Sequence, residues 1–109
     1  MPLAVDAPVL RLDSGRFKGQ SYEIRGTLRV GRHPLNEVSL CDLAVSRYHC
    51  WLSRRDDQVL VEDLASANGT FVNDERVREP RALRPGDRLR VGDTLFVFAE
   101  DERSTILGA

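Results

Sequence analysis

Residues 31–73 read GRHPLNEVSLCDLAVSRYHCWLSRRDDQVLVEDLASANGTFVN, and the rest of the chain is organised around them. It holds two islands of small polar and charged residues, SRYH at 46–49 and SANGT at 66–70, after the pair Gly31 and Arg32. Runs that alternate apolar and polar residues flank each island, which is typical of β-strands joined by loops. Loops on a rigid scaffold often carry binding residues. These islands supply Arg, Ser and Asn donors without an acidic residue, a combination that suits a phosphate.

The same alternation continues on both sides of this stretch, and no window shows a sustained helical period. It predicts strands near 9–13, 20–25, 27–32, 37–40, 48–54, 58–64, 70–72, 76–77, 88–91 and 94–99, and a turn at 81–87. The spacing indicates an all-β sandwich of about eleven short strands with binding loops at one end. The predicted inward face comprises Leu12, Ile24, Leu28, Val30, Cys50, Leu52, Val61, Phe71, Leu89, Val91, Phe96 and Phe98.

Length and composition limit the class of protein. The 109 residues, 41% hydrophobic and 30% charged, indicate one globular domain, expected at 9–100 between a lead-in at 1–8 and a tail at 101–109. The net charge of −1 argues against nucleic-acid binding, because non-specific affinity for DNA comes mostly from Lys and Arg. No stretch reaches the roughly 20 apolar residues that cross a bilayer, so we expect a cytoplasmic protein without membrane contact.

Two cysteines are too few for a disulfide framework. Cys50 follows His49, but Cys41, Cys50 and one His match no zinc pattern at this spacing. We therefore expect packed or surface thiols, and neither a metal nor a cofactor.

Several strings, in their order and spacing, resemble a forkhead-associated (FHA) domain over roughly residues 9–100. They are GR at 31–32, SRYH at 46–49, DL at 63–64, SANGTFVN at 66–73, LRPGD at 83–87 and VGD at 91–93. The resemblance implies an eleven-stranded β-sandwich whose loops at one end bind phosphothreonine peptides. The implied partner is a phosphothreonine-containing protein, either a Ser/Thr kinase or its substrate, and the unphosphorylated chain is expected to be a monomer.

The resemblance also implies roles for single residues. Arg32 and Ser46 match the family's phosphate-contacting arginine and serine. Arg47 borders the phosphate and the peptide residues beyond it, and Asn68 matches the asparagine that holds the peptide backbone. These side chains suit the roles, since a guanidinium is a planar fork of donors, a hydroxyl adds another, and a carboxamide both donates and accepts.

Supporting residues and departures follow from the same match. Gly31, His49 and Gly69 correspond to structural positions around the loops. Ala67 stands where many members carry a polar residue that also reaches the phosphate, so one contact is missing. Asp74 stands where the family's hairpin usually has Gly, which makes the turn costlier if it needs a positive φ.

Plainer interpretations remain open. Arg32 and Arg47 are also consistent with solvated surface charges, Ser46 with a turn cap, and Asn68 with a simple Asn-Gly turn. Trp51 is expected on an outer face, as a candidate for a second contact surface.

Three functional classes are distinguishable. The favoured one is a non-catalytic phosphopeptide-binding module in kinase signalling. The alternative is a β-sandwich scaffold that binds an unmodified partner, which the missing contact at Ala67 allows. An enzyme is disfavoured, because no nucleophile stands beside a plausible base and no paired carboxylates occur in a turn.

Thr105, in the tail, is a candidate target of a kinase. Its phosphate would bind the site of another molecule.

Overall fold

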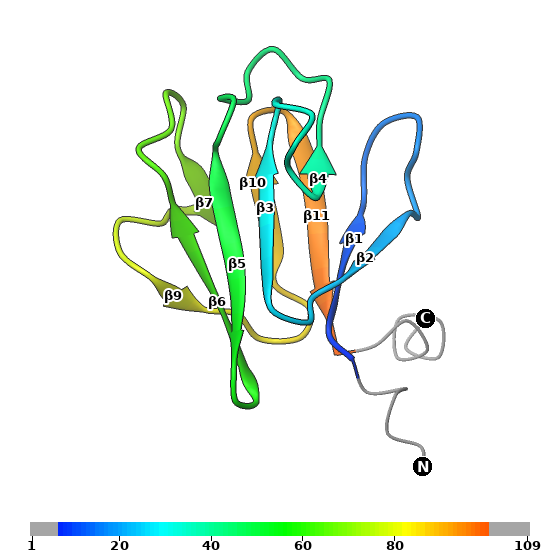
Figure 1. Ribbon diagram of the computed structural model, residues 1–109, viewed down its shortest axis with the longest axis vertical. Helices are drawn as coiled ribbons and strands as arrows, with labels where there is room; N and C mark the ends of the chain where they lie inside the picture. The colour runs from blue at the N-terminus through cyan, green and yellow to red at the C-terminus, as the bar shows by residue number, and fades with distance from the viewer. Residues whose placement is uncertain (1–6, 101–109) are drawn as a thin grey trace.

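The chain folds into two β-sheets packed face to face (Figure 1). The computed structural model describes residues 7–100. The strands are β1 (Val9–Leu12), β2 (Ser21–Glu23), β3 (Thr27–Gly31), β4 (Val38–Ser39), β5 (Cys50–Arg55), β6 (Gln58–Asp63), β7 (Thr70–Val72), β8 (Glu75–Arg76), β9 (Arg81–Ala82), β10 (Arg88–Val91) and β11 (Thr94–Ala99). One sheet has the order β2-β1-β11-β10-β7-β8 and the other β4-β3-β5-β6-β9. The predicted all-β sandwich of about eleven strands is confirmed.

The core lies between the sheets and is formed by alternate residues of the longer strands. Eleven of the twelve residues predicted to face inward are buried. Phe71 is the exception, and that prediction was wrong: its neighbours Thr70 and Val72 are fully buried, while Phe71 is half-buried on the outer face of β7. Because successive side chains of a strand point to opposite faces, burying Thr70 turns Phe71 outward. Thr70 is buried with its hydroxyl donating to Asp63 Oδ1 at 2.7 Å.

One strand was not predicted. Residues 81–82 were expected within a turn, but they form β9 at the edge of the smaller sheet, where Arg81 pairs with Val61 and Ala82 with Leu60. Two residues carry no readable period, and only the distant partner strand β6 makes them a strand.

The hairpin between β7 and β8 has the backbone geometry in which Asp at position 74 is less favourable than Gly. Asn73 and Asp74 have φ values of 50° and 70°, both left-handed. A two-residue hairpin of this kind requires positive φ at both central positions, where Gly is preferred. Asp is one of the few other residues that tolerates this region.

The strand directions place three long loops at one end of the sandwich. The loops that follow β3, β4 and β6 meet at the top of Figure 1, whereas the start of β1 and the end of β11 lie together at the bottom, with Val9 paired to Ala99. Thr105 lies outside the described residues. Residues 7–100 contain no helix long and apolar enough to cross a membrane.

Candidate functional site

The end formed by the loops β3–β4 (32–37), β4–β5 (40–49) and β6–β7 (64–69), here called the loop end, carries all four residues predicted to bind (Figure 1). Arg32 and Ser46 are direct neighbours there. The Arg32 amide donates to the Ser46 carbonyl at 3.0 Å, and Arg32 Nε donates to the Val45 carbonyl at 2.6 Å. These two bonds fix the guanidinium beside Ser46. Within residues 7–100 the two terminal guanidinium nitrogens make no hydrogen bond, so they are available to a ligand.

Ser46 and Asn68 also tie their loops together. The Ala67 amide donates to Ser46 Oγ at 2.9 Å, and Asn68 Nδ2 donates to the Ala44 carbonyl at 2.8 Å. Ser46 keeps its hydroxyl proton to donate, and Asn68 keeps its carbonyl oxygen and its second amide proton. The hydrogen bonds that join the loops therefore leave donors free at the surface.

Arg47 is held by its backbone rather than its side chain. Its carbonyl accepts from the His33 amide at 3.1 Å and from Asn36 Nδ2 at 2.8 Å. The side chain is exposed and, within the described part of the chain, forms neither an ion pair nor a hydrogen bond. The structure brings Arg32, Ser46 and Asn68 into one bonded set of loops and leaves the Arg47 guanidinium at their rim.

His49 connects two of the loops from inside. Its ring is fully buried, with Nδ1 accepting from the Ser46 amide at 3.0 Å and Nε2 lying 2.8 Å from the Gly69 carbonyl. Because Nδ1 must accept, the proton sits on Nε2 and is donated to Gly69. A neutral imidazole therefore sets the position of Ser46 relative to the loop that carries Asn68.

Gly31 is needed for a close approach of the backbone, and Gly69 for a left-handed backbone conformation. A Cβ on Gly31 would overlap the carbonyl oxygen of Arg47 and lie 2.8 Å from Asn36 Nδ2. Gly69 has a φ of 88°, and a Cβ there would lie 3.1 Å from Arg76 Nε. At Gly31 the end of β3 touches the backbone of the β4–β5 loop, and no side chain fits between them.

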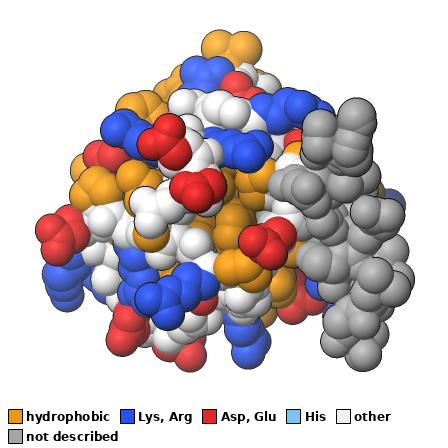
Figure 2. Space-filling view, turned by 90° about the horizontal axis from the view of Figure 1, so that it is seen from below, with side chains coloured by type: hydrophobic (Ala, Val, Ile, Leu, Met, Phe, Trp, Pro, Cys, Tyr) orange, Lys and Arg blue, Asp and Glu red, His pale blue; other side chains and the backbone are white. Residues whose placement is uncertain are grey.

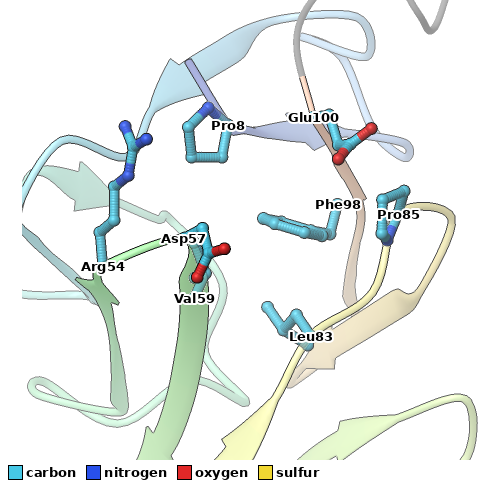
Figure 3. A pocket seen from close by; sticks show the side chains of 8 residues that line it. All are labelled: Pro8, Arg54, Asp57, Val59, Leu83, Pro85, Phe98 and Glu100. Carbon is cyan, nitrogen blue, oxygen red and sulfur yellow. The ribbon is translucent and has the colours of Figure 1, made fainter. Parts of the chain in front are cut away.

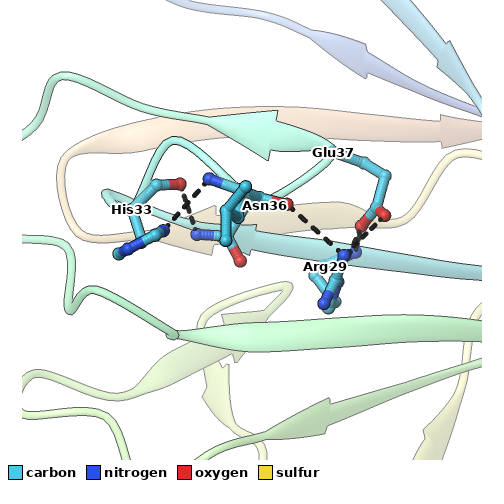
Figure 4. A network of polar contacts seen from close by, with 5 residues as sticks. Arg29, His33, Asn36 and Glu37 are labelled. Atoms are coloured by element: carbon cyan, nitrogen blue, oxygen red, sulfur yellow. Dashed lines mark hydrogen bonds and ion pairs between the residues drawn. The ribbon is translucent and has the colours of Figure 1, made fainter.

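Asn36 is a supporting residue that sequence reasoning missed. It is buried, and its Nδ2 donates to the carbonyls of His33 and Arg47, at 2.8 Å each, while Oδ1 has no partner within the described residues. Figure 4 shows it inside the β3–β4 loop, next to the ion pair of Arg29 and Glu37. Hydrogen bonds from Arg29 lower the pKa of Glu37 to about 2. No local sequence pattern around Asn36 predicts these contacts.

Asp63 was noted only as part of a string and proves to organise the β6–β7 loop. Its carboxylate accepts from the Ser66 hydroxyl, from the Ser66 amide at 3.1 Å and from the Thr70 hydroxyl at 2.7 Å. Burial alone would raise the pKa of Asp63, but these hydrogen bonds outweigh burial and lower the pKa. An Asp three residues before a Ser is a turn signal that could have indicated this role.

Asp42 was missed and holds the β4–β5 loop against the β10–β11 turn. Its Oδ2 accepts from the Asp93 amide and from the Thr94 hydroxyl, both at 2.8 Å, and its Oδ1 accepts from the Ala44 amide at 2.9 Å. Desolvation opposes ionisation, yet the three donors lower the pKa of Asp42. Both carboxylates bind loop backbone and hydroxyl groups, so their charges are already satisfied and do not face a ligand.

Aromatic side chains lie beside the loop end. His33 stacks on Tyr48 with ring centroids 5.1 Å apart, and Tyr48 is 45% exposed. Trp51 is on the outer face of β5, as the sequence predicted, with Nε1 donating to Glu62 Oε1 at 3.2 Å.

The two cysteines differ in their surroundings. Cys41 is exposed, whereas Cys50 is buried, and burial raises the pKa of its thiol to about 12.

A cavity of about 330 Å³ lies at the other end of the sandwich (Figure 3). Val59, Leu83 and Phe98 form its apolar part. Charged side chains of both signs, Arg54, Asp57 and Glu100, stand around it. Figure 2, which views this end from below, shows hydrophobic side chains between blue and red ones. Among the described residues, this end combines charges of both signs, so the loop end is the better site for an anion.

Comparison with known proteins identifies the family of this domain. The family model described as FHA domain matches residues 28–92. The oxoglutarate dehydrogenase inhibitor of Corynebacterium diphtheriae is 41% identical over 83 residues, 73% of this chain and 55% of that protein. The glycogen accumulation regulator GarA of Mycolicibacterium smegmatis is 35% identical over 76% of this chain and 52% of its own. This chain thus spans about half the length of these two relatives.

Solved structures have the same architecture. A domain from a study of phosphothreonine-dependent FHA domain interactions superposes with a TM-score of 0.78 at 33% identity, covering 85% of this chain and 95% of that one. The likeness therefore extends over both sheets and the loops between them.

Proposed function

Because this chain belongs to the FHA domain family, we propose that its loop end binds a phosphothreonine-containing segment of a partner protein and that it does so without catalysis. One of the solved structures that superpose on it comes from a study of phosphothreonine-dependent FHA domain interactions, and the two relatives named above are an inhibitor and a regulator. The hydrogen-bond donors of the loops support the same function.

The observation that carries the proposal is the fixed pair of Arg32 and Ser46. Arg32 Nε is bonded to the Val45 carbonyl, which leaves the two terminal nitrogens as a fork for phosphate oxygens. Ser46 is held from behind by His49 and from the side by the Ala67 amide, with its hydroxyl proton free. Donors that are already in place bind an anion at a lower cost in conformational entropy.

Asn68 and Arg47 complete the proposed site. The unused carbonyl oxygen and amide proton of Asn68 can bond an extended peptide on both sides of its backbone. The exposed Arg47 guanidinium is placed to meet the phosphate or the residues that follow it. Phosphoserine has the same phosphate, so discrimination for threonine would depend on contacts to its methyl group.

We assign the binding domain to residues 9–100 and its partner to the Ser/Thr kinases and their substrates, in the cytoplasm. Phosphorylation of the partner would then switch the complex on, because an unmodified threonine offers neither the charge nor the acceptor oxygens.

Titration of one peptide in phosphorylated and unmodified forms tests this function. We expect binding of the phosphothreonine form only. Arg32→Ala should weaken it by about a hundredfold or more, since hydrogen bonds to charged groups contribute ~1.5–3 kcal/mol each and a fork makes two. Arg32→Lys should also bind poorly, because an ammonium cannot reproduce the fork. Arg55→Ala, an exposed change at the opposite end, is the matched control.

The outcomes separate the functional classes. Equal binding of both forms would select the scaffold that recognises an unmodified partner. Release of inorganic phosphate from the peptide would identify an enzyme. An Arg32→Ala variant that binds within threefold of the parent would remove Arg32 as the anchor.

A further inference from the structure

The outer face of the six-stranded sheet carries a row of arginines that the proposed site does not use. Pairing in register places Arg76 and Arg90 on either side of Phe71, and Arg88 and Arg11 on either side of Val97. Their neighbours along the strands, such as Leu89 and Leu12, are buried in the core. Because side chains alternate between faces, all four arginines project from the same outer surface, which we call the arginine face.

These arginines are not neutralised within residues 7–100. The three ion pairs of the described residues involve Arg25, Arg29 and Arg81, none of which belongs to the arginine face. Among the described residues, three carboxylates stand at its margin, and one of them, Glu23, opposite Val9, is already paired with Arg25. The other two make no ion pair. Asp74 lines a depression of about 150 Å³ together with Arg88 and Arg90, and Asp13 follows Arg11 by two residues. Four guanidinium groups against two unpaired marginal carboxylates leave this face positively charged in a chain whose net charge is −1.

The centre of the arginine face is ordered before any partner arrives. The Arg90 guanidinium lies 4.2 Å from the centroid of the Phe71 ring, a cation–π contact. Phe71 is the one aromatic residue predicted for the core that lies outside it. This stacking fixes Arg90 and leaves the edges of its guanidinium free to donate.

The arginine face begins at the loop end. Arg76 packs so close to Gly69 that a Cβ there would lie 3.1 Å from its Nε, and Gly69 directly follows Asn68. From β8 to β1 the face crosses five neighbouring strands, which at about 4.8 Å between strands amounts to roughly 19 Å. An extended segment of about six residues has this length.

We propose that the arginine face binds an acidic segment of about six residues that is continuous, in the partner, with the phosphothreonine held at the loop end. Carboxylates suit it, since guanidinium groups donate to them in pairs and Arg is favoured over Lys for such recognition. The segment passes Asn68, meets Arg76 and Arg90 first, and ends near Arg11. This inference rests on the proposed function and adds the chemical class of the partner sequence.

The test compares peptides that differ only in one flank. A nine-residue peptide with a central phosphothreonine and neutral flanks serves as the core probe. Extended versions carry six glutamates, or six glutamines, on either the amino or the carboxyl side. We expect one of the two glutamate extensions to tighten binding by about tenfold at low salt relative to its glutamine counterpart, as a few exposed ion pairs would, and the gain to shrink as salt is added.

Variants locate the gain. The double change Arg76→Glu and Arg90→Glu should abolish the gain, and so should Arg11→Glu with Arg88→Glu, which lies farther from the loops and leaves the core probe bound as before. The matched control, Arg54→Glu with Arg55→Glu, makes the same change of charge at the end of β5 and should keep the gain.

The inference is overturned if neither glutamate extension tightens binding more than twofold, or if the gain survives in both arginine-face variants. If the core probe fails to bind at all, the proposed function fails. The arginine face is then tested separately with the glutamate-extended peptide. It must still bind the parent protein more tightly than the glutamine version does, and it must bind the arginine-face variants more weakly than the parent.

Discussion

The two ends of the sandwich are closed by different kinds of interaction. The four polar residues that are buried within residues 7–100, Asn36, His49, Ser66 and Thr70, all lie at the loop end. At the opposite end, the hairpin between β5 and β6 turns through Asp56 with a φ of 58°, and the neighbouring loop turns through Gly86. Both ends contain turn residues with positive φ, but within the described residues the loop end is also held by directed hydrogen bonds from buried side chains.

This difference shows at which end the relative position of the loops is fixed by side chains. A turn needs only a residue that tolerates the required φ, whereas a set of ligand donors needs loops held in register with one another. Loss of one buried hydrogen bond at the loop end would also leave a donor or acceptor unpaired, which lowers the free energy of unfolding by about 1–3 kcal/mol. The loop end should therefore be the more sensitive of the two to small changes, and the following predictions test that difference.

The largest expected difference in stability between the two ends comes from replacing one glycine by alanine at each. Gly31→Ala would push a Cβ into the Arg47 carbonyl, so the end of β3 and the β4–β5 loop must separate, at the upper end of the ~1–3 kcal/mol typical of overpacking. Gly26→Ala, at the opposite end, has no atom within 4 Å of its Cβ and should change the free energy of unfolding by less than about 0.5 kcal/mol. Urea denaturation measures both, and similar losses in the two variants would contradict the comparison.

Acid should weaken the loop end first. The pKa values of Asp42 and Asp63 are lowered, so the folded state binds fewer protons than the unfolded one. Their contribution to stability is present above the unfolded pKa of about 3.9 and is lost as the pH falls from there toward the folded values. Asp63→Asn should lower the free energy of unfolding at pH 7 by about 1–3 kcal/mol, because an amide nitrogen would face the donors of Ser66 and Thr70.

The measurement is urea unfolding at pH 7, 5 and 3. The parent should lose more stability between pH 5 and 3 than Asp63→Asn, since the variant no longer has this carboxylate to protonate. Parallel losses would show that Asp63 does not link the loop to acid.

Side chains that face the ligand should behave differently from those that brace the loops. Ser46→Ala and Asn68→Ala should each weaken phosphopeptide binding by about tenfold, equivalent to ~1.4 kcal/mol. Their inter-loop bonds, to the Ala67 amide and the Ala44 carbonyl, are exposed, so water can replace them and stability should change little. Isothermal calorimetry and thermal unfolding on the same samples separate the two effects. If Asn68→Ala lowers stability but not affinity, Asn68 serves only the turn.

How much the sequence predicts also differs between the elements. Alternation was enough to find β5, β6 and β11, because each runs for six residues with one face buried. It could not find β9, whose two residues carry no period, nor the orientation of Phe71, which depends on the three-residue strand β7. β9 depends on β6, and β7 on β10, partners that are distant in the chain.

The same limit applies to the loop end. The resemblance to the family supplied Arg32, Ser46, Arg47 and Asn68, because their strings are local. Asn36 bonds a carbonyl 11 residues away and Asp42 an amide 51 residues away, so neither role can be read from its own neighbours. Residues that face a ligand tend to lie in short motifs, whereas residues that brace loops are defined by tertiary contact.

Among the substitutions expected to change binding, Ala67→Thr should have the smallest effect and is the one that should increase affinity. Ala67 is exposed between Ser46 and Asn68, and its amide is already bonded to Ser46 Oγ, so the backbone there is fixed. A threonine adds a hydroxyl next to the Ser46 hydroxyl, where many family members carry a polar residue. One added hydrogen bond contributes ~0.5–1.5 kcal/mol, which corresponds to binding tighter by about two- to tenfold. Ala67→Val, which has the same shape without the hydroxyl, is the control and should not tighten binding. An unchanged or weaker affinity for Ala67→Thr would mean that this loop runs past the phosphate on a different path, and the proposed role of Asn68 on the same loop would then have to be abandoned.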